Sequence, residues 1–288
     1  MMSILRRIQY TALAASLFLA GTAIYLALNN EVDELSVEQV SVSIRDLPPA
    51  FDGYRIVQMS DFHLYPLTKP ELIRRAVAIS NELQPDLVAL TGDFVWHKVQ
   101  AIHTLAPILG ELRATDGVYG IMGNHELWTN AGVVQTALEK AGIALLVNQG
   151  VTLKRGQEQL YLAGLDDGWS GHPDLDMALK GAPNRAPVIL MFHEPDLAEA
   201  VARDGRVALQ LAGHSHGGQV QFRQGETLLL PYLAWKYPAG LYQIGKMWLY
   251  TNRGLGVTSI PLRYNCPPEI TVITLRRGEA DRYPEGVK

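Results

Sequence analysis

The chain has 288 residues, of which 48% are hydrophobic and 19% are charged, so it can build a large core and is not expected to be disordered. Its formal net charge is −4, and no lysine- or arginine-rich run follows the first residues, which argues against a nucleic-acid partner. The single cysteine, Cys266, excludes an internal disulfide framework and a zinc site built from cysteines.

The N-terminal residues 1–30 resemble a membrane segment. Arg6 and Arg7 precede an uncharged stretch at residues 8–30, which is about as long as a bilayer-spanning helix. The alternative is a cleaved signal peptide, with a possible small-residue cleavage site at residues 21–23, although the apolar region of a signal peptide is usually shorter. Positive charge before the span and acidic residues after it place the following domain outside the cytoplasm. We therefore expect an uncleaved membrane anchor.

The first half of the remaining chain alternates β-branched or aliphatic runs with segments of helical periodicity. Strands are predicted at residues 37–44, 54–63, 85–94 and 117–126. Helices are predicted at residues 69–83, 101–114 and 131–143. This order is typical of an α/β fold with a largely parallel sheet.

The second half is dominated by strands. They are predicted after residues 144–153, at residues 160–167, 186–196, 207–220, 247–257 and 269–277. Residues 169–187 are rich in Gly, Pro and Asp, which predicts a loop or a lid. We expect one catalytic domain over residues 31–280, followed by a polar tail at residues 281–288.

Side chains that could bind a metal follow the predicted core strands. Seven are potential metal ligands: Asp61, His63, Asp93, Asn124, His193, His214 and His216. Groups that follow the carboxyl ends of parallel strands converge on one crevice. Seven donors are too many for one tetrahedral zinc ion, but they fit two metals that share a bridging carboxylate. His214 and His216 alternate on a segment predicted to be extended, so they should point to opposite sides.

In their order and wording, these motifs resemble the calcineurin-like metallophosphoesterase superfamily. The series Asp-x-His, Gly-Asp, Gly-Asn-His-Glu, His and Gly-His-x-His covers nearly the whole chain after the anchor. The stretches SDFHL, GHSHGGQV and NRGLGVTSIPLRYNCPPEI are most similar to the membrane-associated bacterial YaeI/YkuE-like branch. The fold that this resemblance implies is a four-layered α/β/β/α sandwich with the metals at one edge.

The resemblance also implies a role for each motif residue. One metal would be held by Asp61, His63 and His216, and the other by Asn124, His193 and His214, with Asp93 bridging the two. His125 would be the catalytic residue, a general acid or charge stabiliser beside the phosphate. Glu126 stands where the family often has aspartate, and either residue could orient the neighbouring histidine.

The implied activity is that of a phosphodiesterase or pyrophosphohydrolase. Two divalent ions lower the pKa of bound water, so that a bridging hydroxide can attack the phosphate. Imidazole, carboxylate and amide ligands suit manganese, iron, zinc or cobalt better than calcium or magnesium. The branch implies a bacterial inner membrane and a membrane-associated or lipid-linked substrate. Two alternatives remain open: cleavage of a UDP-linked diacylglucosamine in lipid A synthesis, and a non-catalytic metal-binding scaffold.

Several residues outside the motifs have a structural and a functional interpretation. Arg253 and Arg263 could contact a substrate phosphate or form structural pairs. The apolar, aromatic residues 228–244, which include Trp235 and Tyr237, could be core packing or a membrane-facing lip for a lipid substrate. Cys266 is expected to be a small buried residue rather than a nucleophile.

Overall fold

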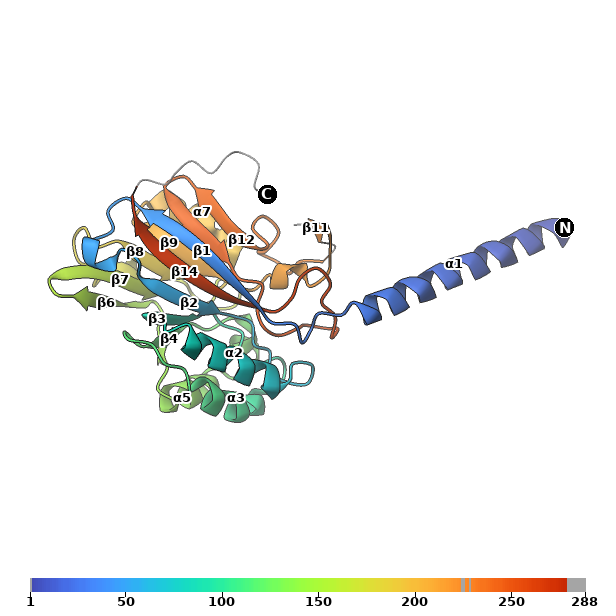
Figure 1. Cartoon of the computed structure of the whole chain (residues 1–288), viewed down its shortest axis with the longest axis horizontal. Helices are drawn as coiled ribbons and strands as arrows, with labels where there is room; N and C mark the ends of the chain where they lie inside the picture. The colour runs from blue at the N-terminus through green and yellow to red at the C-terminus, as the bar shows by residue number, and fades with distance from the viewer. Residues whose placement is uncertain (1, 224–225, 228, 279–288) are drawn as a thin grey trace.

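The computed structural model describes residues 2–223, 226–227 and 229–278, so the polar tail predicted at residues 281–288 lies outside the described part of the chain. The chain begins with the helix α1 (Met2–Leu28), which projects away from the rest of the molecule (Figure 1). Its residues Arg6–Leu28 are long and apolar enough to cross a membrane by length and composition.

The first sheet has six strands and carries the N- and C-terminal strands of the domain side by side. Their order is β1 (Ser36–Ile44), β14 (Glu269–Arg277), β2 (Arg55–Met59), β3 (Leu87–Leu90), β4 (Val118–Gly120) and β5 (Ala144–Leu145). All neighbours are parallel except β14 and β2. Strand β3 is buried along its whole length, which explains why it reads as a continuous apolar run rather than an alternating one.

The second sheet also has six strands. Their order is β12 (Gly240–Ile244), β13 (Met247–Thr251), β9 (Val207–Ala212), β8 (Val188–Met191), β7 (Glu158–Gly164) and β6 (Gln149–Arg155). The four central strands are parallel, and each edge strand is antiparallel to its neighbour. A short hairpin of β10 (Gln221–Arg223) and β11 (Glu226–Thr227) stands apart from both sheets.

The two sheets pack face to face, and helices cover their outer faces. One apolar cluster fills the space between the sheets, with side chains such as Ile56, Leu162 and Leu209. The helices α2 (Pro70–Glu82), α3 (Ile102–Leu109) and α5 (Ala131–Lys140) cover the first sheet (Figure 1). The helices α6 (Leu175–Leu179) and α7 (Ala198–Asp204) cover the second. The four-layered α/β/β/α sandwich is therefore confirmed.

Short helical segments complete the chain: α4 (Asn124–Thr129), η1 (Pro49–Phe51), η2 (Val99–Ala101), η3 (Pro195–Leu197) and η4 (His216–Gly218). Two sequence-based predictions of these segments were wrong in detail. The strand predicted at residues 117–126 stops at Gly120, and its polar end begins helix α4. The loop predicted at residues 169–187 contains helix α6, which Asp174 caps by accepting a hydrogen bond from the backbone N–H of Met177.

Candidate metal centre

The predicted ligands come together where strands of both sheets end. Asp61 and Asp93 follow β2 and β3 of the first sheet, whereas His193 and His214 follow β8 and β9 of the second. Each of the seven predicted ligands is at least 96% buried. Both sheets end at the same place because they pack with their central parallel strands face to face, so the crevice expected for a single parallel sheet is built here from two.

The backbone at these strand ends turns sharply. Asp61, His63, Asp93, His214 and His216 all have positive φ angles, between 41° and 69°. Side chains other than glycine rarely adopt this region, and such residues cluster at functional sites. The prediction of an extended segment at His214 and His216 was therefore wrong: β9 ends at Ala212, and the two histidines diverge because they stand on a tight turn.

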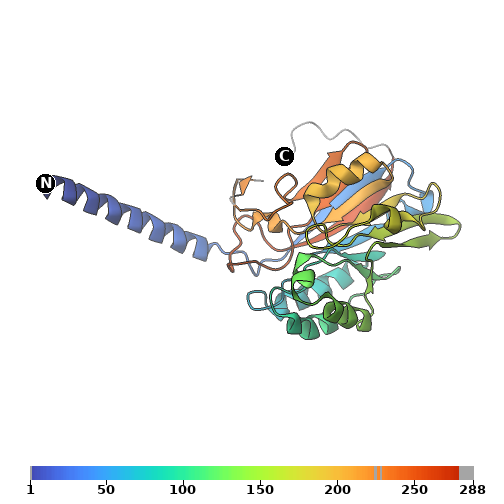
Figure 2. The ribbon, with the colours of Figure 1, turned by 180° about the vertical axis from the view of Figure 1, so that it is seen from behind.

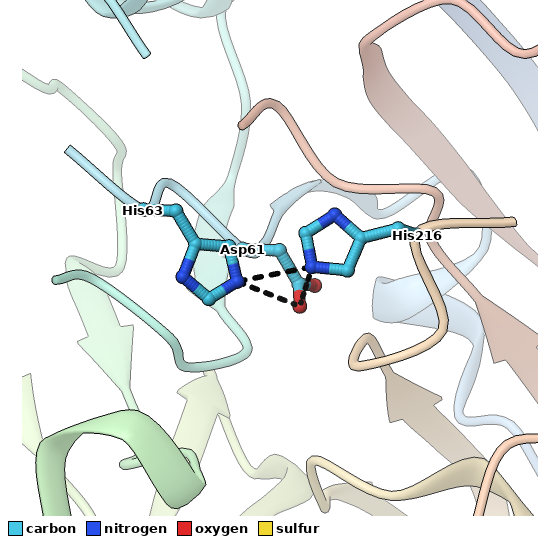
Figure 3. A group of neighbouring side chains, drawn as sticks. All are labelled: Asp61, His63 and His216. Carbon is cyan, nitrogen blue, oxygen red and sulfur yellow. Dashed lines mark hydrogen bonds and ion pairs between the residues drawn. The ribbon is translucent and has the colours of Figure 1, made fainter. Parts of the chain in front are cut away.

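One group of possible metal ligands consists of Asp61, His63 and His216, whose candidate donor atoms lie within 4.8 Å of one another. Figure 3 shows the two imidazoles facing each other beside the carboxylate. The Nε2 atoms of His63 and His216 are 3.0 Å apart, and His216 Nε2 is 3.3 Å from Asp61 Oδ1. Two ring nitrogens and a carboxylate oxygen converging in a buried space fit a bound cation.

The second group consists of Asp93, His193 and His214, with donor atoms within the same 4.8 Å limit. His193 Nδ1 is 2.6 Å from the carbonyl oxygen of Thr91, and His214 Nε2 is 2.7 Å from that of Tyr232. These contacts leave the opposite ring nitrogen of each histidine for a metal, which is the usual arrangement around metal-binding imidazoles.

Asn124 supports the same interpretation. Its side chain is 99% buried, and its Oδ1 has no hydrogen-bond partner among the described residues. An unpaired buried amide oxygen costs free energy, so its presence calls for an explanation. A cation at the second group would supply the missing partner, because amide oxygens are metal ligands.

Asp93 lies between the two groups. Its Oδ2 is 3.4 Å from His63 Nε2 and 3.2 Å from His193 Nε2. Asp93 also forms a third possible metal-binding group together with His63 and His125. This central position is what a bridging carboxylate requires.

Two glycines make room for the carboxylates. A Cβ atom on Gly123 would collide with Asp93 Oδ1, and one on Gly213 would collide with Ser60 Oγ and Asp61 Oδ2. Gly123 and Gly213 therefore allow Asp93 and Asp61 to lie against the backbone.

The charges of the centre are mutually dependent. Burial raises the pKa of Asp61 and of Asp93, but the neighbouring histidines outweigh burial and hold both below their usual range. Burial lowers the pKa of His193, but Asp93, Asp61 and Glu194 outweigh it and raise that pKa well above its usual value. Burial lowers the pKa of His214 to about 4. Asp93 and His193 therefore stabilise each other's charged form.

His125 lies beside the centre on helix α4. Its backbone N–H donates to Asp93 Oδ1, and its Nδ1 is 3.0 Å from the carbonyl oxygen of Trp96. The rings of Trp96 and His125 are stacked with their centroids 4.3 Å apart. Trp96, and not Glu126, therefore orients the His125 ring, which corrects the role expected for Glu126.

The two candidate phosphate-binding arginines serve structural roles. Arg253 forms ion pairs with Glu269 and Glu38. Arg263 is completely buried and donates to backbone carbonyl oxygens of its own loop, between β13 and β14. Cys266 is buried as expected, and burial raises the pKa of its thiol.

An aromatic rim beside the centre was missed in the sequence. It consists of Trp128, Trp169 and Tyr232, with neighbouring ring centroids 4.8 and 5.5 Å apart. The rim adjoins His125 through Trp128 and His214 through Trp169. The spacing of three residues between His125 and Trp128 on a helix was the one available signal.

The segment at residues 228–244 contains both packed and exposed aromatic side chains. Leu228 lies outside the described residues. Tyr237 packs against Tyr242 and donates to Glu199, as core packing would require. Tyr232 and Trp235 are about 60% exposed, which is unusual for large aromatic side chains.

Comparison with known proteins identifies the family. Residues 54–218 match the family described as calcineurin-like phosphoesterase. This chain belongs to the calcineurin-like phosphoesterase family. It is 36% identical to the "Uncharacterized metallophosphoesterase YkuE" of Bacillus subtilis (strain 168) over 93% of this chain and 94% of that protein. It is 31% identical to the "Phosphodiesterase YaeI" of Escherichia coli (strain K12) over 77% of this chain and 82% of that protein.

A vertebrate relative adds a further similarity. The "Transmembrane protein with metallophosphoesterase domain" of Danio rerio is 31% identical over 91% of this chain, which spans only 62% of that protein. This phosphoesterase is a hydrolase of phosphoric esters, and its family is generally dependent on two metals. Helix α1 and the names of such relatives suggest a membrane protein.

Proposed function

We propose that this phosphoesterase is a membrane-anchored phosphodiesterase that uses two metal ions. The observation that carries the proposal is the position of Asp93 between two buried groups of possible ligands. Asp61, His63 and His216 would hold one ion. Asn124, His193 and His214 would hold the other, and Asp93 would bridge the two. When bound, such ions supply positive charge for the phosphate and lower the pKa of water.

His125 is proposed as the catalytic residue. Because its Nδ1 faces the Trp96 carbonyl oxygen, Nε2 is the nitrogen available to the substrate. With Nδ1 donating to Trp96, the doubly protonated ring would also carry a proton on Nε2, which it could pass to the leaving oxygen, leaving His125 neutral with its Nδ1–H still bound to Trp96. General acid catalysis of this kind is typically worth about 10²–10⁴-fold in rate.

A diester is the proposed substrate class because Arg253 and Arg263 are both engaged in structural contacts. A monoester dianion carries one more negative charge than a diester and has more need of such cations. The name of the YaeI relative as a phosphodiesterase agrees with this choice. The proposed metals are manganese, iron, zinc or cobalt, which suit imidazole-rich ligands.

A lipid-linked substrate is proposed from the aromatic rim. Trp128, Trp169 and Tyr232 are 49%, 40% and 60% exposed, yet the rings of Trp128 and Trp169 contact His125 and His214 of the centre. Exposed aromatic side chains beside a polar reaction centre favour a substrate whose phosphate carries an apolar substituent.

The anchor is proposed to comprise residues 1–30, with the catalytic domain beginning at residue 31. Arg6 and Arg7 before the span and acidic residues after it favour a single-pass protein of the bacterial inner membrane whose domain lies outside the cytoplasm.

The activity is tested with bis-p-nitrophenyl phosphate and added Mn²⁺ on the full chain in detergent. We expect the parent to be active, His125→Ala to lose about 10²–10⁴-fold in kcat with its metal retained, and Asp93→Asn to lose metal. His103→Ala, a change of an exposed histidine on α3, is the matched control and should be as active as the parent. If the parent is as inert as His125→Ala with every metal tried, the chain is a metal-binding scaffold instead.

A further inference from the structure

Three loops on the side of the domain from which α1 leaves carry exposed apolar side chains. Tyr65, Phe222 and Ile260 are 44%, 53% and 51% exposed. The chain before α2, the β10–β11 hairpin and the loop after β13 all lie on this side in two opposite views (Figures 1 and 2). We call Tyr65, Phe222 and Ile260 the anchor-side surface.

The end of α1 is fixed to one of these loops. The hydroxyl groups of Tyr25 and Tyr264 are 2.9 Å apart. Asn30 donates from Nδ2 to the carbonyl oxygen of Pro261 and accepts from the backbone N–H of Arg263. The backbone N–H of Glu31 donates to the Arg263 carbonyl oxygen. The helix therefore passes into the domain without a free linker.

The other two loops are tied to the same place. The hairpin is held because the backbone N–H of Gln221 donates to the Tyr264 carbonyl oxygen. The loop with Tyr65 precedes Lys69, whose Nζ is 2.9 Å from Asp33 Oδ2 just after the anchor. All three members of the anchor-side surface are thus positioned with respect to the end of α1.

We propose that the anchor-side surface lies in the lipid headgroup region, so that the domain rests on the bilayer. This inference depends on the membrane anchor of the proposed function. Because α1 is fixed to the domain, a spanning α1 brings these loops to the bilayer surface. Aromatic and aliphatic side chains are stabilised there when they leave water.

The same contacts connect the anchor to the metal centre. The backbone N–H of Cys266 donates to the Glu31 carboxylate, and its Sγ is 3.3 Å from the carbonyl oxygen of His216. Cys266 thus joins the end of the anchor directly to the turn that carries a proposed ligand. A domain resting on the bilayer would hold its reaction centre close to lipid headgroups.

The test attaches an environment-sensitive fluorophore at single positions of the full chain in nanodiscs. Cys266 is fully buried, so a cysteine introduced at the surface is labelled selectively. Phe222→Cys and Ile260→Cys report on the surface, and Leu17→Cys within α1 reports on insertion. Met177→Cys is the control, because Met177 is 58% exposed on α6. Asp176 of the same helix pairs with Arg206, which lines a pocket together with Ser43 and Ile44 at the end of β1.

Insertion should blue-shift the probes at 222 and 260, and lipids with a quencher near the headgroup should quench them but not the probe at 177. Leu17 lies midway along the span, so lipids with a quencher deep in the acyl chain should quench the probe at 17. Quenching at 17 alone would overturn the inference, since the anchor would then be inserted and the domain would stand off the bilayer. Absence of quenching at 17 would overturn the anchor and, with it, this inference. Both outcomes are independent of phosphodiesterase activity. Phe222→Cys and Ile260→Cys are independent variants, so the inference can still be tested if one of them fails to fold.

Discussion

The carboxylate of Glu126 accepts the backbone N–H of Asp93 at 2.9 Å. It also accepts the backbone N–H groups of Phe94, Val95 and Gly123. Glu126 thus joins the two turns that carry Asp93 and Asn124, although it does not contact the His125 ring. Burial and the nearby Asp93 raise the pKa of Glu126 to about 8 in the metal-free protein.

The change Glu126→Gln tests this support. The NH₂ group of the introduced glutamine would face two backbone N–H groups that a carboxylate oxygen of Glu126 accepts in the parent. Because donors that face each other repel, the loops should move apart and displace Asp93. Metal affinity should fall by about 10–100-fold, the usual cost of losing an outer hydrogen bond of a metal site. Metal content after dialysis against graded chelator measures this. Glu139→Gln, on the exposed side of α5, is the control, and equal metal content in both variants would contradict the prediction.

Metal binding should release a proton and strengthen as the pH rises. Burial opposes the charge of His193, but Asp93 raises its pKa well above 6.5, so the metal-free protein holds this proton at neutral pH. A metal on His193 Nε2 must displace that proton, and the apparent affinity therefore falls as the pH is lowered. Calorimetric titration with Mn²⁺ in buffers of different ionisation enthalpy measures the release. A binding enthalpy independent of the buffer would show that the prediction is wrong.

The aromatic rim should matter for large substrates only. Trp169→Ser removes the ring that contacts both Trp128 and Tyr232. We expect kcat/KM on a phospholipid diester to fall about 10- to 100-fold, equivalent to about 1.5–3 kcal/mol of lost apolar contact. Hydrolysis of bis-p-nitrophenyl phosphate should change little, and Met177→Ser should affect neither substrate. Equal losses on both substrates would assign Trp169 to the integrity of the centre.

Arg263 should contribute strongly to stability. Its guanidinium donates to the carbonyl oxygens of Cys266, Arg253, Gly254 and Gly256. Arg263→Met would keep most of the volume but leave these acceptors unpaired, at a cost of at least about 3 kcal/mol. The exposed pair of Arg74 with Glu111 provides the control, because Arg74→Met should change the stability by less than about 1 kcal/mol. Denaturant unfolding in detergent compares the two, and similar midpoints would refute the structural role.

The sequence alone was sufficient to predict the layered fold and to single out possible ligands that the structure brings together. Asp61, Asp93 and His193 each follow an apolar run that is buried on both faces, so their meeting at one edge follows from the geometry of parallel strands. The long uncharged N-terminal stretch likewise predicted α1, because helix length and hydrophobicity are local properties of the chain.

Only the tertiary structure decided how these residues meet. The left-handed turns at His214 and His216 have no periodic pattern, because the surrounding contacts impose them on residues that would otherwise avoid positive φ. The aromatic rim joins α4 to two loops from the second half of the chain. Contacts between segments far apart in the chain depend on packing, which no local pattern of residues encodes.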